Sequence, residues 1–343
     1  MPAFPFLSRR ALLALGLASL AAGPALADDP APATAAAPAQ VYPIEISHAF
    51  GTTVLTEKPQ RVVTVNWANH EVPLALGVVP VGFAAANFGD DDGDGLMPWV
   101  KARLDELGAE VPPLFDEGDG IDFEAVAATR PDVILAAHSG LSQSDYDILS
   151  KIAPVVAYPG QPWTTEWREM IRMNSAGMGM VAEGEALIAD LDARIAAAAA
   201  AHPVLQGKTA LFVTHLDPRD LSRISFYTDN DTRVRFFHDL GLQSPGAVIE
   251  ASATGRFAGE ISAERIDDLN DVDIVVTYGT QTLIDRLSTH LLTRRMGAIS
   301  RQSIVLLQND PQGTAAHPTP LGIPWVLDDY VAALAAAAEA GAD

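Results

Sequence analysis

Short apolar runs rich in β-branched residues alternate with segments of helical spacing along most of the chain. This alternation predicts parallel strands connected by crossover helices. In the first half, predicted strands cover residues 61–65, 79–83, 133–137 and 155–158, and predicted helices cover 71–76, 99–107, 123–129 and 142–152. In the second half, predicted strands cover residues 209–214, 273–277 and 303–307, and predicted helices cover 234–240, 263–269, 283–287 and 324–340.

A segment without any strand pattern separates these two halves. Between residues 164 and 201, apolar residues such as Leu187, Leu191 and Ile195 recur at helical spacing. Three glycines in this segment leave open whether it forms one long helix or two shorter ones. Pro203 ends it, because the residue before a proline avoids helical geometry. We therefore expect an α/β fold of two Rossmann-like lobes, residues 41–160 and 205–343, bridged by a long helical strut over residues 161–204.

Acidic side chains outnumber basic ones two to one, which limits the possible partners. Asp and Glu total 44 against 22 Lys and Arg, a formal net charge of −22. This excess argues against nucleic acid and anionic membrane surfaces as partners. The chain has no cysteine, which excludes disulfides, thiolate nucleophiles and cysteine-ligated zinc or iron–sulfur sites. Hydrophobic residues make up 48%, enough for a globular core.

The N-terminus has the pattern of an export signal. Arg9 and Arg10 precede a short apolar run, and an A-x-A sequence ends at Ala27. Residues 1–27 are therefore expected to be a cleaved signal peptide, and the paired arginines leave both the Tat and the Sec route open. Residues 28–40 are rich in Pro and Ala and are predicted to be a disordered leader. The apolar run is too short to span a bilayer, so we expect no membrane insertion. Because no cysteine follows it, we expect a periplasmic protein that is not a lipoprotein.

A short pattern occurs once in each half. Glu124 lies in an I-x-x-E-x-V sequence that leads to an aspartate and a buried strand, and Glu264 lies in the corresponding I-x-x-E-x-I sequence of the second half. Each glutamate falls in the first turn of a predicted helix, where a negative charge suits the helix dipole. Helix stabilisation alone explains one such glutamate, whereas a matched pair favours a shared function.

At this point the sequence resembles the periplasmic solute-binding proteins that deliver iron–siderophores and cobalamin to ABC importers, in particular the ferric-siderophore branch. The resemblance runs from about residue 50 to residue 330. It rests on five segments in the correct order, residues 51–63, 74–82, 124–134, 152–156 and 318–327.

The resemblance implies the class III architecture of these binding proteins, with two α/β lobes, a rigid helix across both, and a ligand held in the cleft between them. It also implies that Glu124 and Glu264 contact arginines of the membrane permease. Two carboxylates on separate lobes would give a two-point register on a basic surface. A strut across both lobes implies little closure when the ligand binds.

Residues that follow strands are the candidates for the cleft, because ligands of α/β sheets gather at the carboxyl ends of strands. Trp67 and Tyr278 offer aromatic walls, and Arg256 offers a guanidinium for iron-coordinating oxygens. The predicted ligand-binding residues are Trp67, His70, His138, His215, Arg256, Tyr278 and Asn309. The acidic loop at residues 116–120 favours a neutral or cationic chelate over an anionic catecholate, which leaves the siderophore class open.

Two other functions compete with siderophore binding. A bare zinc or manganese ion could be bound by the four histidines that follow strands, His70, His138, His215 and His317. An exported hydrolase is the weaker alternative, because the chain has no G-x-S-x-G or H-E-x-x-H motif. The segment at residues 90–95 resembles the start of a calcium-binding EF-hand loop, but Lys101 stands at its twelfth position instead of Glu.

The sequence thus predicts a monomeric periplasmic protein that captures an Fe(III)–siderophore and delivers it to an ABC importer. It is not expected to be an enzyme, to need a cofactor or to ligate a metal directly. The iron complex is the ligand, and the permease is the protein partner.

Overall fold

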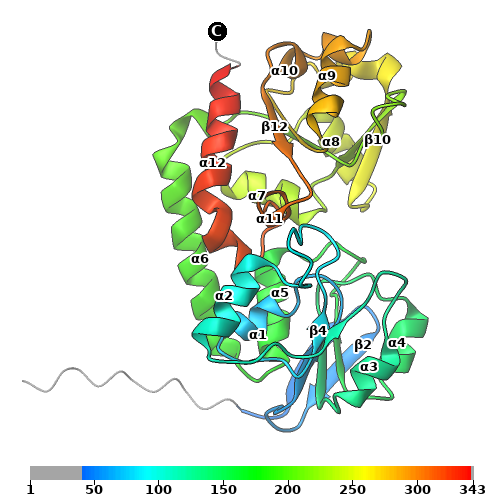
Figure 1. Ribbon diagram of the computed structural model, residues 1–343, viewed down its shortest axis with the longest axis vertical. Coiled ribbons are helices and arrows are strands. Elements are labelled where there is room, and N and C mark those ends of the chain that lie inside the picture. Colours follow the sequence, from blue (N-terminus) through cyan, green and yellow to red (C-terminus); the bar gives the residue numbers. More distant parts are fainter. Residues whose placement is uncertain (1–40, 341–343) are drawn as a thin grey trace, which may run out of the picture. The chain divides into compact units, whose positions relative to one another are not determined.

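The computed structural model describes residues 41–340 (Figure 1). The predicted signal peptide and leader, and the last three positions, lie outside these described residues. No helix within the described range is both long and apolar enough to cross a membrane.

The N-terminal lobe combines one hairpin with short parallel strands. The antiparallel hairpin comprises β1 (Ile44–His48) and β2 (Gly51–Leu55). The parallel strands are β3 (Val62–Thr64), β6 (Val133–Ala136) and β7 (Val155–Ala157), and a second parallel pair, β4 (Phe83–Ala84) and β5 (Leu114–Phe115). The helices of this lobe are α1 (Glu71–Ala75), α2 (Pro98–Glu106), α3 (Phe123–Ala128) and α4 (Gln143–Leu149). Strands β3, β6 and β7 are buried along their whole length, as expected for parallel strands covered on both faces.

The C-terminal lobe has one five-stranded mixed sheet in the order β10-β9-β8-β11-β12. Its strands are β8 (Ala210–Val213), β9 (Arg223–Tyr227), β10 (Ala258–Ser262), β11 (Ile274–Tyr278) and β12 (Ile304–Leu307). The α-helices are α7 (Thr232–Asp239), α8 (Gly246–Ser252), α9 (Gln281–Thr289), α10 (Gly297–Ser300), α11 (Pro311–Ala315) and α12 (Gly322–Ala340). Three 3₁₀ turns complete the lobe, η1 (Pro203–Leu205), η2 (Ala263–Leu269) and η3 (Thr293–Arg295).

The structure differs from the predicted pattern of strands and helices. Short elements such as β5, α8, α10 and α11 were not predicted. The strand expected at residues 79–83 begins only at Phe83, although Val81 and Gly82 already hydrogen-bond to β3 through their backbones. The antiparallel strands β9 and β10 were not predicted, since they mix exposed and buried positions. The helix expected at residues 263–269 is a 3₁₀ segment with a kink at Arg265. The lobe boundaries at residues 160 and 204 remain a proposal.

The strut consists of two helices, α5 (Trp167–Ala176) and α6 (Val181–Ala201). Gly179 lies between them with a φ of +65°, a left-handed conformation that glycine adopts at little cost. Gly184, by contrast, stays inside α6, where a Cβ would collide with the Ser175 hydroxyl of α5. Of the two possibilities left open by the sequence, the structure therefore has two helices.

The two strut helices together pack against elements of both lobes. The buried residues of α6 recur at three- and four-residue intervals, which gives the helix one apolar face. It contacts α5, α7 and α12, while α5 contacts α1 of the N-terminal lobe. Helices α6 and α12 lie side by side (Figure 1). This arrangement confirms the predicted fold of two α/β lobes bridged by helices.

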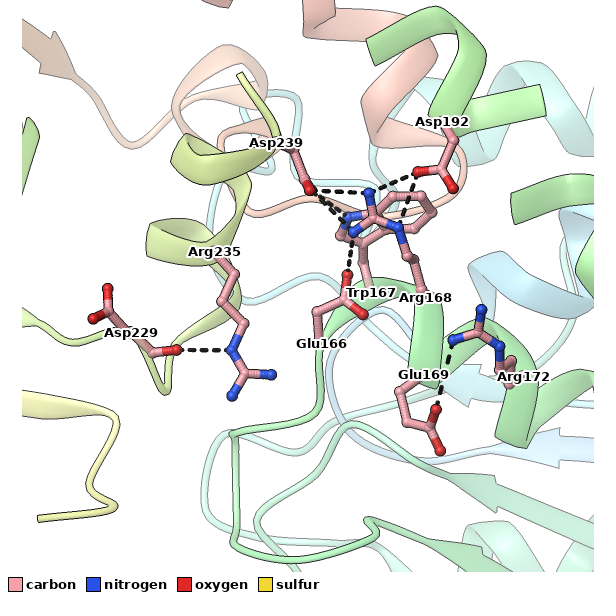
Figure 2. A network of polar contacts seen from close by, with 9 residues as sticks. All are labelled: Glu166, Trp167, Arg168, Glu169, Arg172, Asp192, Asp229, Arg235 and Asp239. Atoms are coloured by element: carbon pink, nitrogen blue, oxygen red, sulfur yellow. Dashed lines mark hydrogen bonds and ion pairs between the residues drawn. The ribbon is translucent and has the colours of Figure 1, made fainter. Parts of the chain in front are cut away.

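One polar network connects the strut to the C-terminal lobe (Figure 2). The guanidinium of Arg168 binds Glu166, Asp192 of α6 and Asp239 of α7 at 2.6–2.9 Å. It also lies 4.2 Å from the ring of Trp167, whose indole N–H donates to Asp239 at 3.2 Å. The end of α7 is therefore held by the strut.

Candidate functional site

The carboxyl ends of strands from both lobes surround a cavity of about 400 Å³. His138 follows β6, His215 follows β8, and Tyr278 ends β11. We call this space the inter-lobe cavity. It is lined by Trp67, Phe88, His138, Trp163, His215, Asp231, Arg233, Phe257, Tyr278, Thr314 and His317.

A buried ion pair forms the most polar part of the cavity wall. Arg233 lies in the first turn of α7 and binds Asp231 through two hydrogen bonds, Nε to Oδ1 at 2.8 Å and Nη2 to Oδ2 at 2.7 Å. Its guanidinium lies 3.6 Å from the ring centroid of Tyr227. Burial lowers the pKa of Arg233, but the Asp231 carboxylate outweighs burial and raises the pKa well above its usual value. The cavity therefore contains one permanent cation whose charge is largely balanced by its partner.

Two tryptophans are held in the cavity wall by strained backbone. Trp67 lies between Asn66 and Ala68, which both adopt positive φ angles near +60°. Trp163 itself has a φ of +62°, which is rare for a bulky residue. Gly140 accommodates its indole, because a Cβ there would lie 2.6 Å from Cε2 of Trp163. Strain of this kind concentrates at functional sites.

The loop that carries Trp67 is hydrogen-bonded to the segment after β6 that carries His138. The Asn69 side chain donates to the carbonyl oxygens of Val65 and His138 at 2.9 and 2.7 Å, and its own oxygen accepts from the His138 backbone N–H. Asn66 in turn accepts from the Gly140 backbone N–H. These tertiary contacts thus hold Trp67 and His138 on the N-terminal side of the cavity.

The four predicted histidines do not form a metal site. The rings of His138 and His317 lie 4.9 Å apart on the cavity wall, and His215 stacks on Tyr278 at 4.6 Å. His70 instead stacks on Phe83 and faces a different cavity. Within residues 41–340, the group of three potential ligands whose donor atoms come together is Asp90, Asp92 and Asp94. The geometry therefore does not support binding of a bare zinc or manganese ion by histidines.

Burial keeps the imidazoles of His70, His138 and His317 neutral. It lowers the pKa of His138 to about 4, although a hydrogen bond with the Thr165 carbonyl oxygen opposes the shift. It lowers the pKa of His70 to about 3, and that of His317 well below its usual value. At neutral pH the cavity therefore presents uncharged imidazoles beside the Arg233–Asp231 pair.

The aspartates at residues 90–94 are engaged by the chain itself. Asp90 accepts from the backbone N–H groups of Gly93 and Gly95 at 2.8 Å. Lys101, at the position where an EF-hand has glutamate, forms ion pairs with Asp92 and Asp94. The Lys101 ammonium therefore already pairs with two of the carboxylates that would otherwise be free to bind a calcium ion.

Besides His70, two predicted ligand residues, Arg256 and Asn309, lie outside the inter-lobe cavity. Arg256 has an exposed side chain, and its carbonyl oxygen accepts from Thr228 and Asn230. Its neighbour Phe257 lines the cavity instead. The Asn309 side-chain oxygen accepts from the Gly89 backbone N–H at 2.7 Å, which connects a loop of the N-terminal lobe to the C-terminal lobe. The cation of the cavity wall is thus Arg233 and not Arg256.

The structure adds residues that sequence reasoning missed, chiefly Arg233, Asp231, Trp163 and Phe88. Arg233 follows β9, a strand that was not predicted, so the rule about strand ends was not applied there. Trp163 follows β7, but five residues beyond the predicted strand. An alternating I-x-F pattern at residues 224–226 was the available signal for β9.

A second cavity of about 260 Å³ lies beside the N-terminal sheet and shares Trp67 and Trp163 with the first. We call it the side cavity. Its lining includes His70, Glu71 and Glu117. The two glutamates predicted to contact a permease lie elsewhere. Glu124 is exposed in the first turn of α3, and Glu264 is exposed in the first turn of η2.

Residues 62–311 match the family model described as periplasmic binding protein. The chain belongs to this family. The family resemblance found in the sequence is thereby confirmed. The match covers most of both lobes and the strut between them.

Several relatives are named for siderophores or ferric chelates. The crystal structure of PiaA from Streptococcus pneumoniae in complex with ferrichrome superposes with a TM-score of 0.83 at 41% identity, over 87% of this chain and 99% of that one. The Fe(3+) dicitrate-binding periplasmic protein FecB of Escherichia coli is 25% identical over 77% of this chain and 85% of its own length. The probable siderophore-binding lipoprotein YfiY of Bacillus subtilis is 26% identical over 68% and 67%. These relatives are binding proteins.

Proposed function

We propose that this periplasmic binding protein captures an Fe(III)–siderophore in the inter-lobe cavity and delivers it to an ABC importer. The observation that carries the proposal is the Arg233–Asp231 pair set among the aromatic rings of the cavity wall. A guanidinium fork suits the oxygen atoms that surround chelated iron, and aromatic faces suit the organic shell of the chelate. The ferrichrome complex of the similar PiaA supports the same function.

The charge of the cavity favours a ferric hydroxamate within this class. Arg233 and Asp231 balance each other, and the imidazoles of His138 and His317 are neutral. Three monoanionic hydroxamates balance Fe³⁺, so their complex is neutral, whereas a ferric tricatecholate carries several negative charges. Burying such charges without cationic partners is costly. A siderophore whose iron centre is a neutral ferric trihydroxamate therefore fits the inter-lobe cavity best.

A panel of chelates tests this function. Ferric trihydroxamate, tricatecholate and citrate complexes, each with an iron-free control, are titrated while tryptophan fluorescence is followed. Trp67 and Trp163 lie in the cavity wall, so a bound iron complex is expected to quench their emission. Strong quenching by the ferric hydroxamate and weak quenching by its iron-free form are expected. Absence of quenching by all three complexes would refute the proposal.

The role of Arg233 is tested with its partner, because removing one member of a buried pair leaves an uncompensated charge. The double variant Asp231→Asn with Arg233→Gln should lower affinity for the ferric hydroxamate by about 10- to 100-fold. The chain offers a matched control in Asp217 and Arg219, an exposed pair with the same spacing in the same lobe. Asp217→Asn with Arg219→Gln should leave affinity unchanged.

We also infer that Glu124 and Glu264 contact the permease, one from each lobe. Both are exposed in the first turn of their helices, within reach of a docking protein. Glu124→Ala with Glu264→Ala should abolish transport and leave ligand affinity unchanged. Glu124→Ala with the equally exposed Glu110→Ala keeps the second docking acid and serves as a control. Intact transport by the first variant would contradict the assignment.

The remaining parts of the proposal concern the export of the protein, its oligomeric state and its mode of action. We infer that residues 1–27 direct the chain to the periplasm by the Tat or the Sec route and are then removed, and that no lipid anchor is attached because the chain has no cysteine. We expect a monomer that works by capture and handover, without catalysis and without a cofactor of its own.

A further inference from the structure

The side cavity is a possible extension of the ligand site. It has a volume of about 260 Å³ and shares both Trp67 and Trp163 with the inter-lobe cavity. A ligand that contacts these two indoles therefore lies next to both spaces. The remaining question is which chemical group the side cavity would accept.

The acidic residues that line the side cavity, Glu71 and Glu117, have no lysine or arginine beside them among the described residues. Glu71 is engaged, because its oxygens accept from the Trp99 indole and from the backbone N–H groups of Leu321 and Gly322. Glu117 is therefore the carboxylate with the greater remaining capacity for a ligand.

Glu117 is half-buried and held in place from one side. It accepts from the Asn66 backbone N–H at 3.2 and 3.0 Å and from the Asn66 side chain at 2.9 Å. An ionised carboxylate offers about four lone-pair positions, so these contacts with a single residue leave room for another donor. Asn66 is the neighbour of Trp67, which places this acceptor beside the shared indoles.

We propose that the side cavity binds a pendant ammonium group of the siderophore, with Glu117 as its acceptor, while the iron centre lies in the inter-lobe cavity. This inference rests on the proposed function. Arg233 in the C-terminal lobe and Glu117 in the N-terminal lobe would then orient the ligand, because the iron-bound oxygens face a cation and the pendant arm faces an anion. An ammonium donates charge-assisted hydrogen bonds, which are stronger than neutral ones.

The experiment compares three ferric trihydroxamates: a linear one with a terminal primary amine, its N-acetyl derivative, and a cyclic one without a pendant arm. Affinities are measured by fluorescence quenching for the full chain as exported. The amine form should bind about tenfold more tightly than the N-acetyl form. In Glu117→Gln this preference should fall to within about twofold, and the affinity of the cyclic complex should change little.

Two further variants separate the effect of the Glu117 charge from the effect of the free volume in the side cavity. Asp119→Asn removes an exposed acid two residues away and should keep the tenfold preference. Ala85→Leu places a larger side chain in the side cavity and should remove the preference by filling the space. Equal affinities of the amine and N-acetyl complexes for the unmodified protein would overturn the inference while leaving the proposed function intact. If none of the three complexes binds, the preference for ferric hydroxamates fails instead, and the catecholate and citrate complexes of the panel above then decide the proposed function.

Discussion

Arg168 of α5 and Asp239 of α7 form a bidentate ion pair, with Nη2 2.9 Å from Oδ1 and Nη1 3.1 Å from Oδ2. Helix α7 starts at Thr232 and ends at Asp239, so its last residue is bound to the strut while Arg233 in its first turn lines the inter-lobe cavity. Both partners are mostly buried, with 23% and 19% of their side chains exposed. The strut therefore fixes the helix that carries the cavity cation.

Asp239→Asn should weaken this connection. The change removes one of two oxygen acceptors for Arg168 and Trp167, and leaving buried donors without partners costs about 1–3 kcal/mol. Urea unfolding should show that loss, and affinity for the ferric hydroxamate should fall because α7 is held less firmly. Asp190→Asn breaks the exposed pair with Arg194 on α6 and should cost no more than about 0.5 kcal/mol. Equal stability of the two variants would contradict a structural role for Asp239.

Glu71 stabilises the start of α12 from the N-terminal lobe. Its carboxylate is 2% exposed and accepts from the Trp99 indole at 2.8 Å and from the Leu321 and Gly322 backbone N–H groups at 3.0 and 3.2 Å. In Glu71→Gln, one oxygen becomes an NH₂ group, so some of these donors lose their acceptor. We expect a loss of about 1–3 kcal/mol in the free energy of unfolding.

The exposed Glu106→Gln provides the comparison for Glu71→Gln. Glu106 belongs to α2 and pairs with Arg103 at the surface, so its substitution should change the free energy of unfolding by no more than about 0.5 kcal/mol. Urea unfolding monitored by circular dichroism measures both variants. An unchanged unfolding midpoint for Glu71→Gln would show that the N-terminus of α12 does not depend on this contact.

Stability should fall as the pH is lowered from 6.5 towards 4. Burial lowers the pKa of His70 to about 3 and that of His138 to about 4. It also lowers the pKa of His317 well below the usual value of an imidazole. Unfolded imidazoles take up a proton near pH 6.5 while the native ones stay neutral, so the unfolded state binds more protons in this window. Each histidine then lowers the free energy of unfolding by up to about 1.4 kcal/mol per pH unit.

The carboxyls of Glu71 and Glu117 act in the opposite direction, because burial raises the pKa of each and the native state therefore takes up these protons first. The histidine effect is isolated by comparing the unmodified protein with His138→Gln at pH 7, 6 and 5. The free energy of unfolding of this variant should fall less steeply as the pH is lowered, because one buried histidine no longer contributes to the fall. Parallel pH profiles for the two proteins would contradict the burial of a neutral imidazole at position 138.

The parts of the fold that the sequence predicted are those with continuous apolar runs. Strands β6, β8 and β11 are buried at every position, so each appears as an uninterrupted apolar segment. Strand β10 lies at the edge of its sheet with β9 beside it, and both strands mix buried with half-buried and exposed residues, which weakens that signal.

The residues of the site were likewise predicted only where they follow strands with a continuous apolar run. The rule about strand ends located His138, His215 and Tyr278, which follow or end predicted strands and line the inter-lobe cavity. Arg233 was missed because its position depends on the unpredicted β9. Trp163 was missed because its place depends on a left-handed backbone and on space left by Gly140, a residue that is distant in the sequence. Such tertiary requirements leave no local pattern.

Gly140 and Gly160 form a matched pair that tests the placement of Trp163. A Cβ at Gly140 would lie 2.6 and 2.7 Å from indole atoms of Trp163, whereas a Cβ at Gly160 would meet nothing within 4 Å. Gly140→Ala should therefore displace the indole and cost about 1–3 kcal/mol through overpacking. Because Trp163 lines both cavities, affinity for the ferric hydroxamate should fall and the tryptophan emission of the free protein should shift.

Gly160→Ala introduces the same methyl group into the connection between β7 and α5, which carries Trp163, but without a neighbour to displace. Alanine restricts the unfolded chain, so this variant should be as stable as the unmodified protein or more stable by up to about 1 kcal/mol. Its affinity and emission spectrum should be unchanged. If both variants bound the ferric complex equally well, Trp163 would not be part of the ligand site, since only Gly140→Ala disturbs its ring.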